Sequence, residues 1–253
     1  MDRPFVVVLA AASADGRIAS GPNKTMWEDM ADSEAATPAG GEVWRKVEGE
    51  VKRLHRPQVD MLGSNSLAKE GEPLQPLPPY SGDPAPLYED FLPEALVQRP
   101  GHAGWLVVVD GRGRLRSGFK GEPGLGWHML HITAQQAPPE YLAFLRAQGI
   151  PYLVAGTGPV DLPAALGKLQ AKLSVSTVLT TAGGKLGGAL LRAGLVDEVN
   201  ILVRPVVIGG FTTPCLFDSP DLRPGDRPVR LELVHVQPEQ AGHLWLRYRV
   251  VKD

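Results

Sequence analysis

Short apolar segments alternate with amphipathic segments through most of the chain, and this alternation restricts the fold more than any other feature. Residues 5–12 form a continuous valine- and alanine-rich run, which is typical of a strand buried on both faces. Residues 42–55 follow with the spacing of an amphipathic helix, whose apolar positions are Trp44, Val47, Val51 and Leu54. The alternation predicts an α/β protein with a mixed, mostly parallel sheet and helices on both faces.

The same patterns place the other elements. Strands are expected at residues 59–63, 105–109, 128–133, 152–155, 177–181 and 198–204. Helices are expected at residues 138–148, 162–173 and 186–193, the second begun by Asp161 or Thr157. Two alternating runs flank a turn at residues 237–242, and they predict an antiparallel hairpin at the C-terminal end.

Residues 71–100 differ from the rest of the chain. They contain eight prolines and several acidic residues, which is incompatible with a regular core element. We interpret this segment as a surface insertion in a single domain that covers residues 1–253.

Composition excludes several classes of protein. The formal net charge is −2 and no long basic run is present, so neither nucleic acid nor a membrane surface is expected as a partner. The apolar run at residues 5–12 is too short for a signal peptide or a membrane span, which favours a cytoplasmic protein. A single cysteine, Cys215, forms no internal disulfide, and His128 and His131 fall on opposite faces of a strand, so no metal site is expected.

Residues 178–191 join a buried strand to a helix through Gly183 and Gly184. Glycine allows close approach of a ligand to the backbone, and a helix start offers N–H groups and a positive dipole end, which suits a pyrophosphate. The spacing does not match the dinucleotide fingerprint of the Rossmann fold. A phosphate site and a plain tight connection between strand and helix therefore both remain open.

Three other segments carry polar groups at strand ends. Residues 63–66 could contact a cofactor or cap a helix. Arginines follow the strand at 105–109, where they could hold an adenosine 2′-phosphate or form a solvated turn; they are Arg112, Arg114 and Arg116. Asp15 follows the first strand as a site carboxylate or as a turn residue.

The order of these segments resembles a known family. Residues 4–19, Asp110 at a strand end, and residues 180–210 with their Ala-Gly-Gly-Lys-Leu-Gly-Gly and Arg-Pro-Val-Val-Ile-Gly-Gly motifs are similar to the riboflavin-biosynthesis reductases. That family includes the C-terminal domain of the bifunctional deaminase-reductase and lies in the dihydrofolate-reductase-like superfamily. The resemblance implies a three-layer dihydrofolate-reductase-like fold, NADPH as the hydride donor, and a homodimer.

The resemblance also implies roles for individual residues. It places along the cofactor Trp27, Gly63, Ser66, Gly111, Gly183, Gly184, Lys185 and Leu186. Thr25 and Asp15 are expected on the substrate side, with Asp15 a candidate proton donor and catalytic residue. Glu70 falls where the family often has an aspartate near the cofactor. A substrate-binding arginine is expected near Arg53, His55 and Arg56, without a choice among the three.

Two departures from the family concern the substrate. Ala182 stands where riboflavin-pathway members have a glutamate, and alanine offers no side-chain hydrogen bond. Residues 72–77 contain no basic residue for a ribosyl phosphate. A site loses selectivity for a polar substrate when such hydrogen-bonding partners are absent. We therefore predict that the cofactor half of the site is intact and that the substrate half has diverged.

The sequence therefore predicts an NADPH-dependent reductase that transfers a hydride to a small heterocyclic substrate, pyrimidine- or pteridine-like, with Asp15 or water supplying the proton. One alternative is the 5-amino-6-(5-phosphoribosylamino)uracil reductase of riboflavin biosynthesis itself. A second alternative, from another class, is a non-catalytic nucleotide- or flavin-binding protein with the same fold.

Overall fold

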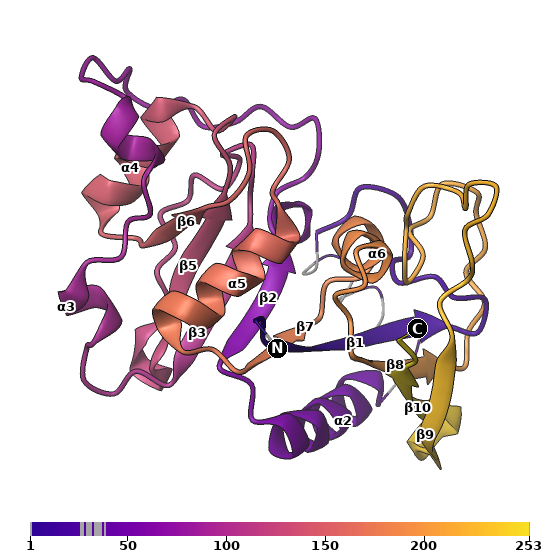
Figure 1. The fold of residues 1–253 in the computed structure, drawn as a ribbon. Helices are drawn as coiled ribbons and strands as arrows, with labels where there is room; N and C mark the ends of the chain where they lie inside the picture. The colour runs from indigo at the N-terminus through magenta and orange to yellow at the C-terminus, as the bar shows by residue number, and fades with distance from the viewer. Residues whose placement is uncertain (1, 26–27, 29–31, 33–36, 38, 253) are drawn as a thin grey trace. The chain divides into compact units, whose positions relative to one another are not determined.

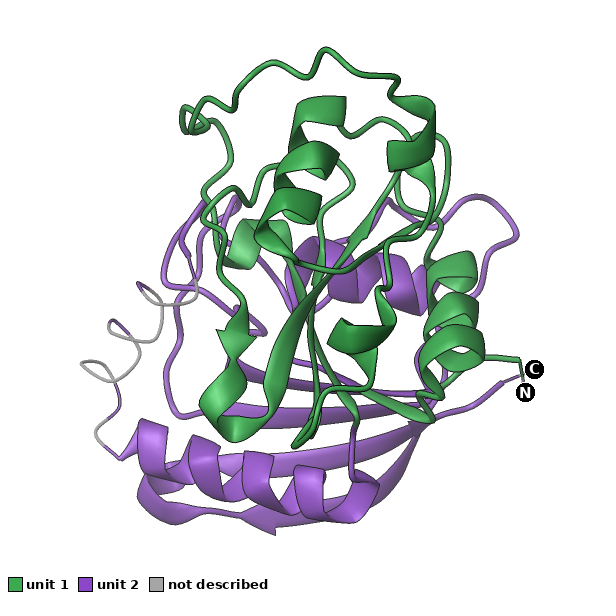
Figure 2. Ribbon diagram, turned by 90° about the vertical axis from the view of Figure 1, so that its left-hand side faces the viewer, with its two compact units in different colours: residues 1–4, 58–178 green, residues 5–57, 179–253 purple. Residues whose placement is uncertain are grey.

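The computed structural model describes residues 2–25, 28, 32, 37 and 39–252. Its chain divides into two compact units, each built from two stretches of sequence (Figure 2). Unit 1 comprises residues 1–4 and 58–178, and unit 2 comprises residues 5–57 and 179–253. The single domain expected from the sequence stays a prediction, and each unit is described by itself.

Unit 1 is built on parallel strands. Its sheet has the order β4-β5-β3-β2, with β6 also paired to β5. The strands are β2 (Val59–Gly63), β3 (Gly104–Val109), β4 (Gly121–Glu122), β5 (Trp127–Thr133) and β6 (Tyr152–Val154). Only β4 runs antiparallel to its neighbour. The helices are α3 (Glu94–Val97), α4 (Pro139–Gln148) and α5 (Leu162–Leu173), and the 3-10 turns are η1 (Ser64–Ser66), η2 (Ala85–Tyr88) and η3 (Pro123–Leu125).

Local signals account for the ends of the two longer helices. Pro139 occupies the first position of α4, and Gly149 ends it with a φ of 66°. The side chain of Asp161 accepts a hydrogen bond from the Ala164 N–H at 2.9 Å and so caps α5. Of the two capping residues considered from sequence, Asp161 is the one used.

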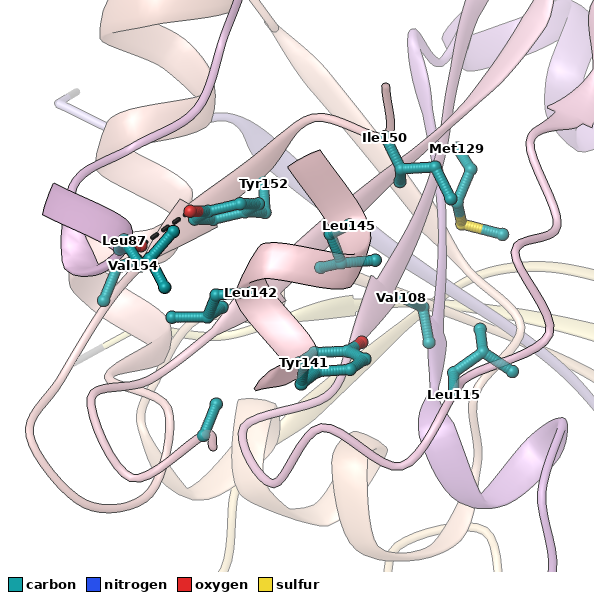
Figure 3. Packing of buried hydrophobic residues seen from close by; sticks show 11 residues of the cluster. Leu87, Val108, Leu115, Met129, Tyr141, Leu142, Leu145, Ile150, Tyr152 and Val154 are labelled. Carbon is teal, nitrogen blue, oxygen red and sulfur yellow. Dashed lines mark hydrogen bonds between the residues drawn. The ribbon is translucent and has the colours of Figure 1, made fainter. Parts of the chain in front are cut away.

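The proline-rich segment is packed onto unit 1. Leu87 is 5% exposed and joins the core around Tyr141, Leu142 and Tyr152, and Figure 3 shows the Tyr152 hydroxyl bonded to Leu87. Phe91 forms an antiparallel bridge with Tyr152 of β6. The segment therefore pairs with a strand at the edge of the sheet, where unpaired backbone groups would otherwise face solvent.

An ion-pair cluster fastens the same segment. The Asp90 carboxylate accepts hydrogen bonds from the Val154 N–H and from Lys168, both at 2.8 Å, and pairs with Lys172 at 2.6 Å. Burial opposes ionisation of Asp90, but these contacts outweigh it and lower its pKa. The segment predicted as a surface insertion thus has defined contacts with α5 and β6.

Unit 2 holds a mixed sheet of order β1-β8-β10-β9 (Figure 1). Its strands are β1 (Phe5–Ser13), β8 (Glu198–Arg204), β9 (Leu231–Pro238) and β10 (Leu244–Val250). β1 and β8 are parallel, whereas β10 is antiparallel to both β8 and β9, as the predicted hairpin requires. Its helices are α2 (Gly40–His55) and α6 (Gly184–Arg192), and η4 (Gln240–Gly242) forms the hairpin turn. Strand β7 (Thr177–Thr180) begins in unit 1 and ends in unit 2.

Helix α2 packs on one face of this sheet. Its buried residues, Val43, Val47 and Val51, contact a core that includes Leu202 and Trp245. The prediction that Leu54 belongs to this stripe is wrong, because Leu54 lies in the last turn and is 44% exposed. The packed part of the helix ends at Val51. Among the described residues, no helix combines the length and apolar character that crossing a membrane requires.

Candidate active site

Asp15 lies two residues after the end of β1, at the edge of unit 2 where β1 and β8 both end. Its carboxylate accepts hydrogen bonds from the Ser13 hydroxyl at 2.6 Å, the Ile208 N–H at 3.0 Å and the Gly209 N–H at 2.7 Å. The bond from Ser13 and the two backbone bonds lower the Asp15 pKa to about 2. The carboxylate therefore fixes the loop that follows β8.

This environment does not support Asp15 as a proton donor. A carboxyl group with a pKa of about 2 is ionised at neutral pH, and each of its oxygens already accepts a backbone hydrogen bond. The geometry instead indicates that Asp15 positions the loop at residues 206–210, which it holds through the Ile208 and Gly209 N–H groups.

The double glycine packs closely against other parts of unit 2. A Cβ on Gly183 would lie 2.5 Å from Ile18 Cδ1. Gly184 has a φ of 56°, is buried, and donates its N–H to the carbonyl oxygens of Cys215 and Leu216, each at 3.1 Å. The Gly184 N–H is thus used within the chain, which supports a tight connection at this position.

The remaining site residues predicted for unit 2 lie next to the double glycine or in the segment that follows β1. Lys185 is exposed in the first turn of α6, next to the half-buried Leu186. Ala182, which replaces the family's glutamate, is buried. The Thr25 hydroxyl donates to Glu28 Oε2 at 3.0 Å, and Trp27 lies outside the described residues.

In unit 1 the predicted cofactor residues meet at one sheet edge. Gly63 ends β2 and is in register with Val109, the last residue of β3, so both parallel strands end together. Ser66 follows in η1, and Gly111 follows Asp110 after β3. The structure therefore brings Gly63, Ser66 and Gly111 to the same edge of unit 1, and their contact with a cofactor stays a prediction.

The structure separates the three arginines that the sequence left equivalent. Arg114 is buried, and its guanidinium binds Asn65 Oδ1 and the carbonyl oxygens of Ala68 and Lys69. Arg116 donates to the carbonyl oxygens of Gly113 at 3.1 Å and Gln75 at 2.8 Å.

Arg112 has a different environment from its two neighbours. Its side chain is 54% exposed and lies 3.6 Å from Glu70. Exposed ion pairs are weak, so a dianionic phosphate could displace Glu70. Arg112 is therefore the arginine of this loop that is accessible to a ligand.

The end of α2 lies at the other edge of the unit 2 sheet. His55 Nε2 is 2.8 Å from Glu198 Oε1 in the first residue of β8, whereas Asp15 follows Ser13, which pairs with the last residue, Arg204. Six strand steps of ~3.3 Å separate these positions by roughly 20 Å. The structure therefore does not bring Arg53, His55 and Arg56 to the edge that carries Asp15, and the expected substrate-binding arginine stays a prediction.

A groove in unit 2 also lies apart from the predicted residues. It has a volume of about 380 Å³ and is lined by α2 and the C-terminal hairpin, including Lys46, Glu239 and Arg247. Lys46 pairs with Glu239 at 2.6 Å, and Arg247 pairs with Glu198 at 2.8 Å. Across the described part of the chain, no group of three or more metal-ligating side chains is arranged to hold a metal ion.

Comparisons with known proteins show the family. The model of the RibD C-terminal domain matches residues 4–244. A curated relative, the 2,5-diamino-6-ribosylamino-4(3H)-pyrimidinone 5′-phosphate reductase of Methanothermobacter thermautotrophicus, is 28% identical over 91% of both chains. The enzyme of the same name from Aquifex aeolicus is 22% identical over 85% of this chain and 83% of its own.

Solved structures share the fold. A pyrimidine reductase-like protein from Corynebacterium diphtheriae matches with a TM-score of 0.64 at 19% identity, covering 99% of this chain and 93% of that one. The riboflavin biosynthesis reductase of Saccharomyces cerevisiae matches with a TM-score of 0.58 at 15% identity, covering 99% and 91%. These matches confirm the predicted α/β fold. The chain belongs to the RibD C-terminal domain family and is a reductase of that family, as its resemblance to the riboflavin-biosynthesis reductases predicts.

Proposed function

We propose that this reductase uses NADPH to reduce a pyrimidine that carries a phosphorylated ribose. The observation that carries the proposal is the family match over residues 4–244, together with the similarity of the chain to curated reductases named for such a substrate. Each unit also presents small and polar residues at the carboxyl ends of parallel strands, where α/β proteins bind ligands. Fold alone would not assign the activity.

Each edge, taken by itself, offers groups that suit part of a dinucleotide. In unit 1, Gly63 ends β2 and Gly111 follows β3 at the same sheet edge, and Arg112 offers an accessible guanidinium for the 2′-phosphate. In unit 2, exposed Lys185 at the start of α6 suits a phosphate group. The nicotinamide, when bound, supplies the hydride, and the protein aligns donor and acceptor.

The substrate side differs from that of the family at Ala182. In place of a charged partner, unit 2 offers the loop at residues 206–210, which Asp15 holds through two backbone bonds. We propose that this loop contacts the heterocycle and that a water supplies the proton. The substrate of the curated relatives is the first candidate, and a heterocycle without the ribosyl phosphate is the second.

Arg112→Ala is expected to weaken NADPH binding by about tenfold while leaving NADH binding unchanged. The variant removes a charged hydrogen bond to the 2′-phosphate, which NADH lacks. Because Arg112 is exposed, the contact is expected to be worth about 1.5 kcal/mol, the lower end for a charged hydrogen bond. Ligand fluorescence and the rise in melting temperature measure both affinities. Lys120→Ala serves as the control, because Lys120 is an exposed cation of the same unit that lies outside the loop at residues 110–116.

The activity test follows NADPH absorbance with each candidate substrate. Oxidation with the phosphorylated pyrimidine of the relatives supports the proposal, and oxidation only with simpler heterocycles supports a diverged substrate. Tight NADPH binding without turnover on any of them would favour a binding protein. Equal loss of affinity for NADPH and NADH in Arg112→Ala would contradict the proposal that Arg112 binds the 2′-phosphate of NADPH.

We further propose that two copies pair through the apolar face of the C-terminal hairpin. Leu233 and Val236 are 53% and 50% exposed, and they lie opposite Tyr248 and Leu246 in the strand register. Leu231 on the same strand is 42% exposed. An apolar sheet face of this kind is typical of a protein interface, and a second copy presents a self-complementary surface.

A Leu233→Glu, Val236→Glu double variant is expected to convert the dimer to a monomer, because each interface would bury two unpaired charges per copy. Light scattering after gel filtration measures the mass. Leu125→Glu provides the control, since Leu125 is 69% exposed in the other unit and should not affect association. A dimer that survives the double change would place the interface elsewhere.

A further inference from the structure

Three buried polar side chains form a hydrogen-bonded chain inside unit 1. Asp110 follows β3, Tyr141 lies in the first turn of α4, and His131 is in β5. The Tyr141 hydroxyl is 2.6 Å from His131 Nδ1 and donates to Asp110 Oδ2 at 3.1 Å. All three residues are at most 1% exposed.

The chemistry of the three groups fixes the proton positions. A carboxylate accepts and does not donate, so the single hydroxyl proton of Tyr141 points to Asp110. The Nδ1–H of His131 then donates to the Tyr141 oxygen. Burial lowers the His131 pKa to about 4, which keeps the ring neutral and compatible with this arrangement.

Asp110 also holds the loop that follows it. Its Oδ2 accepts the N–H groups of Arg114 and Leu115, both at 2.7 Å. The loop packs directly on the tyrosine, because a Cβ on Gly113 would lie 2.8 Å from the Tyr141 ring. Gly113 has a φ of 69°, so this position combines a left-handed backbone with close packing.

Arg114 extends the chain to the second cofactor segment of unit 1. Its backbone is held by Asp110, and its guanidinium binds Asn65, Ala68 and Lys69, which follow β2. One continuous network therefore runs from His131 through Tyr141, Asp110 and Arg114 to the residues next to Glu70. Arg112, the accessible arginine, directly precedes Gly113, which packs on the Tyr141 ring.

Burial of polar and charged groups has a desolvation cost that lowers the free energy of unfolding unless other interactions offset it. Within the described residues, Asp110 Oδ1 has no hydrogen-bond partner, which adds to that cost. We propose that the Asp110–Tyr141–Arg114 network is a positioning device that sets Arg112 relative to Glu70 and thereby determines selectivity for NADPH over NADH. The proposal rests on the proposed function, and its residues act through Arg112 without touching the cofactor.

Tyr141→Phe tests this device by removing one oxygen from a buried ring. Affinity for NADPH is expected to fall by about tenfold, and affinity for NADH to stay unchanged, because Asp110, which holds the loop, loses one of the three hydrogen bonds that orient it while the rest of the site is intact. Tyr152→Phe is the matched control. Tyr152 is equally buried in the same core, but its hydroxyl bonds to the Leu87 carbonyl at 2.6 Å and to Arg146 at 2.8 Å, away from the loop.

The two variants separate positioning from general destabilisation. A loss of NADPH affinity in both Tyr141→Phe and Tyr152→Phe, or in neither of them, would contradict the proposed positioning role. A parallel loss of NADH affinity in Tyr141→Phe would do the same. Should Tyr141→Phe fail to fold, Arg114→Lys decides, because it keeps the charge and loses the fork that binds Ala68 and Lys69; unchanged selectivity there contradicts the proposal. Wild-type protein that binds neither nucleotide would instead overturn the proposed function.

Discussion

Gly188→Ala is expected to lower the free energy of unfolding by about 3 kcal/mol, the upper end of the range for overpacking a tight contact. A Cβ at this position would lie 2.2 Å from the carbonyl oxygen of Asp218 and 2.6 Å from its carbonyl carbon. These are backbone atoms, so a rotamer change does not relieve the clash. Helix α6 and the segment at residues 216–218 would have to separate. Thermal and urea unfolding followed by circular dichroism measure the effect.

Gly49→Ala is the matched control in the same unit. Gly49 lies within α2, and a Cβ there would meet nothing within 4 Å. Helix propensity alone favours alanine over glycine by about 1 kcal/mol at both positions, so Gly49→Ala is expected to stabilise the protein. Equal stabilisation by the two substitutions would show that α6 does not approach residues 216–218 as closely as the structure indicates.

Glu198→Ala is expected to cost about 4 kcal/mol, because it breaks a buried, fully bonded ion pair. Glu198 is 5% exposed. Its Oε1 accepts bonds from His55 at 2.8 Å, Asn200 at 2.9 Å and Arg247 at 2.8 Å, and its Oε2 accepts a second bond from Arg247 at 2.8 Å. Without the carboxylate, the Arg247 charge keeps no partner of comparable geometry.

The pH dependence of this pair has a definite sign. Burial opposes ionisation of Glu198, but the bonds from His55, Arg247 and Asn200 outweigh it and lower the pKa from 4.5 to about 2. A lowered folded-state pKa contributes stability above the unfolded value, and that stability is lost as the pH falls. The difference between wild type and Glu198→Ala should therefore be constant near neutral pH and shrink between about pH 4.5 and 2.

Glu232→Ala provides the control for both readouts. Glu232 is 60% exposed and pairs with Arg249 at 3.4 Å, and a surface pair of this kind contributes about 0–1 kcal/mol. Its removal should change stability little at any pH. A Glu198→Ala protein as stable as Glu232→Ala would mean that the network around Glu198 contributes little to folding.

The sequence predicted the regular elements because their signals are local. β1 and β8 appear as apolar runs, the hairpin as two alternating runs, and α5 as a stripe with a capping aspartate, and each signal is contained in a dozen or so neighbouring residues. The family motifs around Asp15, Gly183 and residues 204–210 are also continuous in sequence. They were sufficient to identify the family, and the comparison over residues 4–244 confirms it.

The roles of individual polar residues depend on contacts between distant parts of the chain. The two Gly-Gly pairs at residues 183–184 and 187–188 look like one repeated motif in sequence, yet Gly183 faces Ile18 whereas Gly188 faces Asp218. Asp15 is a plausible acid in sequence, yet the bond from Ser13, together with bonds from Ile208 and Gly209 almost two hundred residues away, lowers its pKa to about 2. No local pattern contains this information.

The sequence alone determined the fold class, the order of strands and helices, and the family, because hydrophobic periodicity and motifs act over short distances. Only the tertiary structure decided which arginine is accessible and which is an anchor. Arginine occupies every second position of residues 112–116. Arg114 is buried and bonded to Asn65 and Ala68, whereas the Arg112 side chain is 54% exposed. The physical reason is that burial and pairing of a charge depend on what the fold brings beside it.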